Sequence, residues 1–187
     1  PTILRGAGAY RHFIPATVKR ITGREEFVTA YTPYQAEISQ GILQSIFEYQ
    51  TMICALTGMD VANASVYDGA TATAEAAELC VARKKTRVLI SATVSPEVLK
   101  VVKTYAFGRD TDLQVIPAKD GLTDLKALQD MVGDNTACVI VQQPNFYGLL
   151  EEAEEIGRIA HEVKAKFIMN VNPISLGILK TPAECGA

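Results

Sequence analysis

The sequence lacks the features that mark a nucleic-acid-binding or membrane protein. Acidic residues outnumber basic ones by 21 to 18, and the net charge of -3 gives no indication of a basic face for phosphate backbones. Apolar runs such as "VLI" and "VIV" are far too short to span a bilayer, and no signal or transit segment is visible. The 187 residues, 48% of them hydrophobic, are instead typical of one α/β domain.

Metal-binding motifs are missing too. The chain has only two histidines, His12 and His161, and neither has the spacing of a ligand pair. We expect His161 to be solvated on an exposed helix. No C-x-x-C pair occurs, so we expect the four cysteines to be buried, reduced thiols in the cytoplasm or a similarly reducing compartment: Cys54, Cys80, Cys138 and Cys185.

Nucleotide-binding fingerprints are also absent. The stretch "GAGAYR" at residues 6–11 begins like a dinucleotide fingerprint, but Arg11 replaces the third glycine and no strand precedes it. The pattern G-x-x-x-x-G-K-[ST] of nucleoside triphosphate sites does not occur. We therefore expect neither kind of nucleotide site.

Alternating apolar patterns predict a doubly wound α/β domain. Helical patterns separate most of five strand-like segments, "VANAS", "RVLIS", "LQVIP", "ACVIVQ" and "KFIMNV". Runs that are apolar at successive positions suit strands covered on both faces, and right-handed crossovers make such a sheet parallel. Ser95-Pro96 and Thr123-Asp124 mark helix starts, and helical spacing over residues 38–56 predicts a long helix that ends at Gly58.

The first forty residues differ from the rest. They carry few strand signals but several tyrosines and prolines, so we predict an N-terminal arm and interface segment over residues 1–40. Residues 41–187 are then the first part of a large α/β domain. Because the chain starts at Pro1 and stops at "PAECGA" without a closing element, we expect this domain to be incomplete and the chain to be a fragment.

An anion site is predicted in "NASVYDGATATAEAA", residues 63–77. A short apolar strand, a turn of small polar residues and an alanine-rich helix follow one another there. Backbone amides at a helix start favour negative charge, so this order is typical of a phosphate cradle.

The stretch "YTPYQAEISQG" at residues 31–41 has two open explanations. In the first, Pro33 sets an extended turn, the tyrosine hydroxyls lie in water and Glu37 favours a helix start. In the second, the paired aromatic and amide side chains form an interface or a ligand-facing arm. The sequence alone does not decide between them.

Several long motifs resemble one family. "GAGAYRHFIPATV", "YTPYQAEISQGILQSIFEYQTMICALTGMDVANASVYDGATATAEA", "VQQPNFYG" and "NPISLGILK" are similar to the first subunit of two-subunit glycine decarboxylase, the P-protein of the glycine cleavage system. The likeness covers nearly the whole chain. It implies a fold type I architecture of pyridoxal phosphate (PLP) enzymes, in which a mostly parallel sheet lies between helices.

The resemblance also assigns positions around the cofactor. Where many relatives of the fold have an aspartate at the ring nitrogen, this chain has Asn170, whose amide carries no charge. Ser95 stands where family members often have a histidine to stack on the ring, and it is read here as a helix cap. The positional equivalents of the phosphate cradle, which we expect to be vestigial, are Asp68, Gly69, Ala70 and Thr71.

The resemblance implies that this chain lacks the Schiff-base lysine. Lys180 in "GILKTP" is the only lysine near a plausible strand end, and it is read more simply as an exposed charge. PLP would then be carried by a homologous lysine-bearing second subunit in a heterotetramer. Candidates for the partner interface or the substrate pocket are Tyr10, Tyr31, Tyr34, Gln35 and Glu37, with Phe146, Tyr147 and Gly148 as weaker ones.

The implied activity is oxidative decarboxylation of glycine. The aminomethyl group would pass to the lipoyl arm of the H-protein, whose disulfide receives the electrons. Two alternatives stay open. The chain could belong to a self-sufficient PLP enzyme that acts on another amino acid, or to a non-catalytic scaffold that keeps only the fold.

Overall fold

The computed structural model describes residues 8, 10 and 12–187, and its contacts divide the chain into two units. Unit 1 comprises the described residues up to Ala55 together with Asp60–Ala64, and unit 2 comprises Leu56–Met59 and Ser65–Ala187. Most of the stretch 6–11 that begins like a dinucleotide fingerprint, and the first part of the predicted arm, lie outside the described residues.

Unit 1 is helical. The helix expected over residues 38–56 is confirmed as α3 (Ala36–Thr57), and Gly58 follows it with a positive φ of 74°. The structure adds α1 (Ala16–Thr22) and α2 (Glu25–Val28), which the sequence pattern did not indicate. The two helices span only seven and four residues, which is too short for a helical period to recur. The predicted boundary between residues 40 and 41 lies inside α3 and stays a prediction.

Unit 2 contains the expected parallel sheet. Its four strands lie in the order β2-β1-β5-β6, and all neighbouring pairs are parallel. The bounds are β1 (Arg87–Ser91), β2 (Asp112–Ile116), β5 (Thr136–Gln143) and β6 (Lys166–Val171). A separate two-stranded hairpin consists of β3 (Ala118–Lys119) and β4 (Leu122–Thr123), and the 3₁₀-helix η1 spans Pro173–Gly177.

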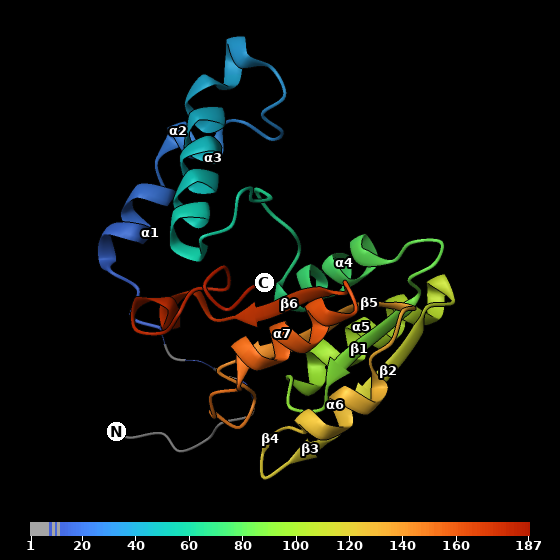
Figure 1. Ribbon diagram of the computed structural model, residues 1–187. Coiled ribbons are helices and arrows are strands. Elements are labelled where there is room, and N and C mark those ends of the chain that lie inside the picture. The colour runs from blue at the N-terminus through green and yellow to red at the C-terminus, as the bar shows by residue number, and fades with distance from the viewer. Residues whose placement is uncertain (1–7, 9, 11) are drawn as a thin grey trace. The chain divides into compact units, whose positions relative to one another are not determined.

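Helices cover both faces of this sheet (Figure 1). On one face, α4 (Gly69–Cys80) and α5 (Pro96–Arg109) pack over Val88 and Ile90 of β1, and on the other, α6 (Leu125–Met131) and α7 (Ala153–Glu162) pack over Leu89. Successive strand residues point to opposite faces, so a strand covered on both sides is apolar at every position. The doubly wound arrangement predicted from those runs is confirmed.

One predicted strand is wrong. The segment "VANAS", residues 61–65, is irregular in the structure, and Val61 is 85% exposed. It contains a single β-branched residue beside alanines and an asparagine, which have little preference for strands. The predicted order of strand, turn and helix therefore begins with an irregular segment that leads into α4.

Helices begin at both predicted starts in unit 2, although the cap of α6 is Asp124 and Thr123 ends β4. Asp124 caps α6, because its side chain accepts hydrogen bonds from the backbone N–H groups of Lys126 and Ala127 at 2.9 and 3.1 Å. Ser95 occupies the cap position of α5 before Pro96, but its side chain makes no capping hydrogen bond. Its backbone N–H instead donates to the Gln142 side chain at 2.8 Å.

A buried carboxylate fixes the loop after β5. Glu151 accepts hydrogen bonds from the Thr93 hydroxyl at 2.6 Å, from the Asn145 amide at 2.9 Å and from the Thr123 backbone N–H at 2.9 Å. Asn145 also donates to the Gly121 carbonyl and accepts from two backbone N–H groups of its own loop. One side chain thus holds three segments together through neutral donors.

Substitution of Gly157 in α7 tests how closely this helix packs against the sheet. A Cβ there would lie 2.8 Å from the Cys185 carbonyl oxygen and 3.0 Å from the Phe167 ring. We expect Gly157→Ala to lower the free energy of unfolding of the full-length protein by roughly 1–3 kcal/mol, because the backbone must shift. Gly108→Ala in α5, where a Cβ meets nothing within 4 Å, is the matched control and should stabilise slightly. Equal urea midpoints for both variants would contradict this packing.

Glu151→Gln tests the buried network. The glutamine places an NH₂ group against the Thr123 N–H or against the donors of Thr93 and Asn145, so at least one buried donor loses its acceptor. We expect a loss of about 1–3 kcal/mol in the free energy of unfolding, measured with urea. Glu152→Gln, at the exposed neighbour, should change it by less than about 0.5 kcal/mol. A neutral Glu151→Gln would show that the network does not hold the loop.

Candidate functional site

The carboxyl ends of the strands form the candidate site, as in other open α/β sheets. Near its amino-terminal end β5 contributes Cys138, and Cys80, the last residue of α4, packs against the apolar cluster that contains Cys138. The carboxyl end of α4 therefore lies at the amino ends of the strands. Since α4 spans twelve residues, about 18 Å, its first turn lies towards the carboxyl edge.

The first turn of α4 is capped by the chain itself. The Asp68 carboxylate accepts a hydrogen bond of 2.7 Å from the Thr71 backbone N–H. This bond is the largest of the effects that lower the pKa of Asp68. The Thr73 hydroxyl donates to the Gly69 carbonyl. Asp68 and Gly69 are exposed, and Ala70 and Thr71 are half-buried.

Asn170 lies on the same face of the sheet as α4. Its register partner in β5 is Gln142, and both continue the series of side chains that includes Cys138 and Ile140, which pack under α4 and α5. Asn170 is half-buried, and Gln142 is buried and accepts the hydrogen bond from Ser95. This edge thus combines a capped helix start with two neutral amides.

Lys180 lies elsewhere. It is exposed, as expected, and forms an ion pair with Glu154 of α7, which raises the pKa of the lysine. Because α7 covers the opposite face of the sheet from α4, this ammonium group is held away from Asn170. The ion pair borders a pocket of about 660 Å³ beside the first turn of α7.

The loop after β5 has both a buried and an exposed part. Asn145 is buried, Phe146 is half-buried, and Tyr147 and Gly148 are exposed. The rings of Phe146 and Tyr147 meet edge to face, with centroids 6.0 Å apart. Of the two aromatic residues that were weak site candidates, only Tyr147 thus presents its ring to the surroundings.

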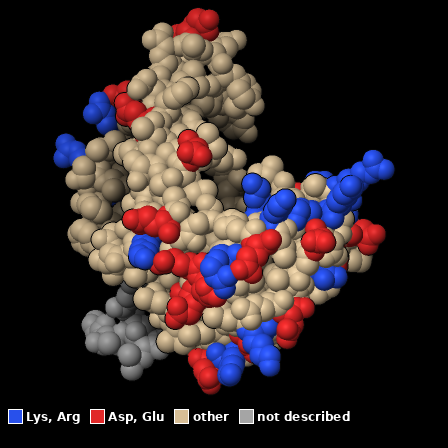
Figure 2. All heavy atoms as spheres, in the orientation of Figure 1, with Lys and Arg blue, Asp and Glu red and all other residues tan. Residues whose placement is uncertain are grey.

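The remaining candidate residues lie in unit 1: Tyr10 precedes α1, and the other four lie on or just before α3. Tyr31 is fully exposed and Tyr34 is 88% exposed, and Gln35, Glu37 and Tyr10 are exposed as well. A backbone hydrogen bond from Tyr34 to Thr32 shapes the turn, and one from Ser39 to Gln35 begins the helix. The Tyr31 and Tyr34 side chains are thus almost fully exposed. Figure 2 shows charges of both signs over both units, with more tan surface over the visible helices of unit 1 than over unit 2.

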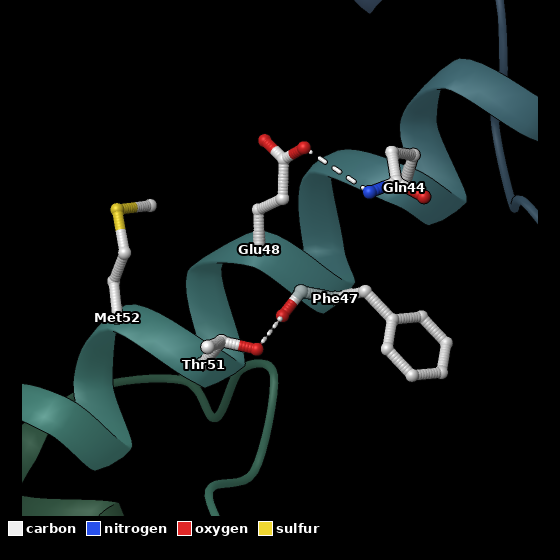
Figure 3. A pocket seen from close by; sticks show the side chains of 5 residues that line it. All are labelled: Gln44, Phe47, Glu48, Thr51 and Met52. Atoms are coloured by element: carbon white, nitrogen blue, oxygen red, sulfur yellow. Dashed lines mark hydrogen bonds between the residues drawn. The ribbon is translucent and has the colours of Figure 1, made fainter.

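An open pocket of about 450 Å³ lies along α3 (Figure 3). Phe47 and Met52 give it exposed apolar surface, and the Gln44 amide donates to the Glu48 carboxylate at 3.1 Å. All five lining residues belong to α3: Gln44, Phe47, Glu48, Thr51 and Met52. α3 therefore presents exposed apolar side chains next to polar ones, and exposed apolar surface beside polar groups is typical of a contact surface.

Other expectations meet mixed outcomes. All four cysteines are free, as expected, but only Cys138 and Cys185 are buried. His161 is exposed yet is not merely solvated, because its Nε2 lies 2.7 Å from the Gly186 carbonyl oxygen in a hydrogen bond. Among the described residues, no His, Cys, Asp and Glu side chains cluster as a metal site, and no helix is long and apolar enough to cross a membrane.

Two features of the structure could not be predicted from the sequence. Glu151 is one of several glutamates in "LLEEAEEIG", and nothing in that run distinguishes the buried one. The packing of Cys80 against the cluster that contains Cys138 joins residues far apart in the chain. The helical pattern of α4 and the apolar run of β5 assign each cysteine to an element. They do not predict which elements pack together.

Comparison with known proteins identifies the family. The profile of the glycine cleavage system P-protein family matches residues 2–187. "Probable glycine dehydrogenase (decarboxylating) subunit 1" of Carboxydothermus hydrogenoformans is 56% identical over 187 residues, which are 100% of this chain and 42% of that protein. The protein of the same name in Bacillus subtilis (strain 168) is 55% identical over 180 residues, 96% of this chain and 40% of that protein. The chain thus spans about two fifths of the length of these relatives.

Comparison with solved structures supports the same family. The crystal structure of glycine decarboxylase (P-protein) of the glycine cleavage system, in inhibitor-bound form, superposes with a TM-score of 0.91 at 44% identity, over 97% of this chain and 41% of that one. A C-DES mutant with glycine covalently linked to its PLP cofactor has a TM-score of 0.60 at 16% identity, over 88% of this chain and 45% of that one. That likeness shows the fold alone, which is fold type I of the PLP-dependent enzymes. The chain belongs to the glycine cleavage system P-protein family.

Proposed function

We propose that the protein containing this chain is subunit 1 of a cytoplasmic glycine dehydrogenase (decarboxylating) and that it works with a homologous second subunit. The observation that carries the proposal is the 56% identity with a relative of that name along all 187 residues. The designation "subunit 1" supports the existence of a second subunit, and the four free thiols support a reducing compartment.

The proposed reaction transfers an aminomethyl group. The bond from the glycine α-carbon to its carboxylate breaks, and carbon dioxide leaves. The carbon then bonds to one sulfur of the lipoyl disulfide of the H-protein while the other sulfur gains a proton, so the disulfide accepts two electrons. PLP, when bound, supplies the electron sink for the carbon that loses carbon dioxide.

We place PLP on the second subunit, because the described residues of this chain do not fit it. The carboxylate of Asp68 accepts the Thr71 N–H and puts negative charge where a phosphate would bind. Asn170 is a neutral amide and cannot hold a pyridinium proton by charge. Lys180 is paired with Glu154 on the opposite face of the sheet. No step of the reaction is therefore assigned to a cofactor on this chain.

The proposed contribution of this chain to the enzyme is an interaction surface for the second subunit. Tyr31, Tyr34 and the apolar side chains of Phe47 and Met52 are exposed in unit 1, and aromatic side chains with large apolar area are common anchors of protein interfaces. Placed against the second subunit, they would exclude water from its glycine pocket and complete its wall. Tyr10, Gln35 and Glu37 would add polar contacts at the border of the same interface.

Reconstitution tests this proposal directly. Glycine-dependent exchange of carbon dioxide is measured with PLP and H-protein, for the full-length subunit alone, the lysine-bearing homologue alone and both together. We expect exchange only with both proteins. Borohydride reduction followed by peptide mass analysis should place the reduced cofactor on a lysine of the homologue.

The other outcomes separate the alternatives. Exchange and labelling by this subunit alone would overturn the shared-site proposal and favour a self-sufficient PLP enzyme. Activity of the homologue alone, unchanged when this subunit is added, would identify this protein as a scaffold or a separate protein.

Tyr34→Ala tests the proposed interface. Removing an exposed ring should leave the free energy of unfolding of the separate subunit nearly unchanged, because the ring buries little surface there. We expect affinity for the second subunit to fall by about 10-fold or more, as for an aromatic interface residue that costs over 1 kcal/mol. Phe107→Ala in α5, where the ring is 89% exposed, is the control. Equal affinities for Tyr34→Ala and unmodified protein in a titration would refute this role.

A further inference from the structure

The long helix α3 is bent near its start. Ser39 has backbone angles of φ −117° and ψ 23°, which differ from regular α-helix values by about 54° and about 65°. The backbone N–H groups of Ile38 and Ser39 both donate to the Gln35 carbonyl, at 3.2 and 2.9 Å, so one short turn closes before the bend. In Figure 1 this first turn departs from the line of the rest of α3.

The residues around the bend explain why the helix changes direction there. Sharp helix bends usually occur at proline or at glycine and serine residues, and α3 contains no proline. Ser39 and Gly41 stand on either side of Gln40. The Ser45 hydroxyl donates to the Gly41 carbonyl oxygen at 2.9 Å, and a side-chain bond to the carbonyl four residues earlier often bends a helix.

Packing within the described part of the chain does not require a glycine at position 41. A Cβ there would meet nothing within 4 Å, and glycine inside a helix is less stable than alanine. Gly41 therefore weakens the helix without gaining a close contact. Ser39 is the one residue that α3 buries, with an exposure of 6%, so the bent residue itself is held by packing.

The bend determines how the candidate interface residues are directed. Tyr34 and Glu37 lie before it, and Phe47 and Met52 lie after it, and all four side chains are exposed. In a regular helix, each side chain points in a direction fixed by its position along one axis. The angles at Ser39 break that progression, so the residues before and after the bend can contact different parts of a partner.

We propose that Ser39 and Gly41 are positioning residues for the shared glycine site. Their bend directs the segment 31–38 towards the glycine pocket of the second subunit, while the longer part of α3 contacts the surface around that pocket. This inference rests on the proposed function, because the second subunit supplies the pocket. It adds the requirement that the interaction surface be bent as well as exposed. A straighter and more stable α3 should therefore bind the second subunit less tightly.

Gly41→Ala in the full-length subunit tests the bend. Alanine favours a continuous helix and its Cβ has room, so the free energy of unfolding in urea should be unchanged or higher. The affinity for the second subunit in a titration should fall severalfold, and the KM for glycine in the reconstituted exchange should rise severalfold. Gly108→Ala in α5, where a Cβ also meets nothing within 4 Å, is the control that should change neither.

Gly41→Ser separates the bend from the added bulk. Serine also adds a Cβ but favours a helix less than alanine, so this variant should lose less affinity than Gly41→Ala. Equal losses in both variants, or equal affinities of Gly41→Ala and unmodified protein, would overturn the proposed role of the bend alone. Failure of the unmodified subunit to bind the second subunit would instead contradict the proposed function, and this inference with it.

Hydrogen exchange gives a measurement that needs no variant. When the unmodified full-length subunit binds the second subunit, exchange of the backbone amides of residues 34–41 should slow severalfold, because the bent turn is held in the interface. Slower exchange in the rest of α3 with no change over residues 34–41 would show that the second subunit contacts the helix but not the bent turn. That result would overturn the proposal.

Discussion

Burial of β5 on both faces is the constraint on which unit 2 depends. Residues 136–142 of this strand are all buried, and β1 and β6 take up its backbone hydrogen-bonding groups on either side. Alternate side chains feed the two apolar clusters, so neither face of the strand can be left uncovered. Each fully buried Val, Ile or Leu contributes roughly 1.5–3 kcal/mol relative to an exposed one. A parallel sheet with helices on both sides follows from that requirement.

The packing of helices on this sheet also determines which groups lie at its carboxyl edge, where the candidate site is. Because the carboxyl end of α4 packs against the cluster that contains Cys138, near the start of β5, its first turn lies towards Asn170. Glu151 holds Thr93, Thr123 and the loop after β5 at the carboxyl end of the sheet. The groups at this edge satisfy one another: Asp68 with Thr71, and Gln142 with Ser95. An edge at which the Asp68 carboxylate already accepts the Thr71 N–H is a poor host for an additional anion, which supports the proposed placement of the cofactor on the second subunit.

The sequence predicted those elements whose residues are buried in a regular period. β1, β2, β5 and β6 were found from successive apolar positions, and α3, α5, α6 and α7 from helical spacing or capping residues. The segment 61–65 was misread because a short apolar run next to a helix start looks like a strand even when no neighbour pairs with it. α1, α2 and the hairpin of β3 and β4 were missed because they are short and leave no period. The start of α4 could be predicted from Asp68 and its small neighbours, but not that Asp68 itself would take the Thr71 amide. The Glu151 network and the packing of Cys80 against the cluster of Cys138 depend on tertiary contacts that no local pattern contains.

Unit 1 presents the opposite energetic situation. α3 has 22 residues but buries only Ser39, and Ile38, Phe47 and Met52 are exposed along it. An isolated helix gains little in water, so most of its stability must come from packing of an apolar face. These exposed apolar side chains are not buried within the described part of unit 1, and ordering the helix costs conformational entropy that burial has to offset. A second subunit that covers α3 and Tyr34 would supply this burial. On the proposed assembly, the surface that makes unit 1 marginal alone is therefore what makes the two subunits depend on each other.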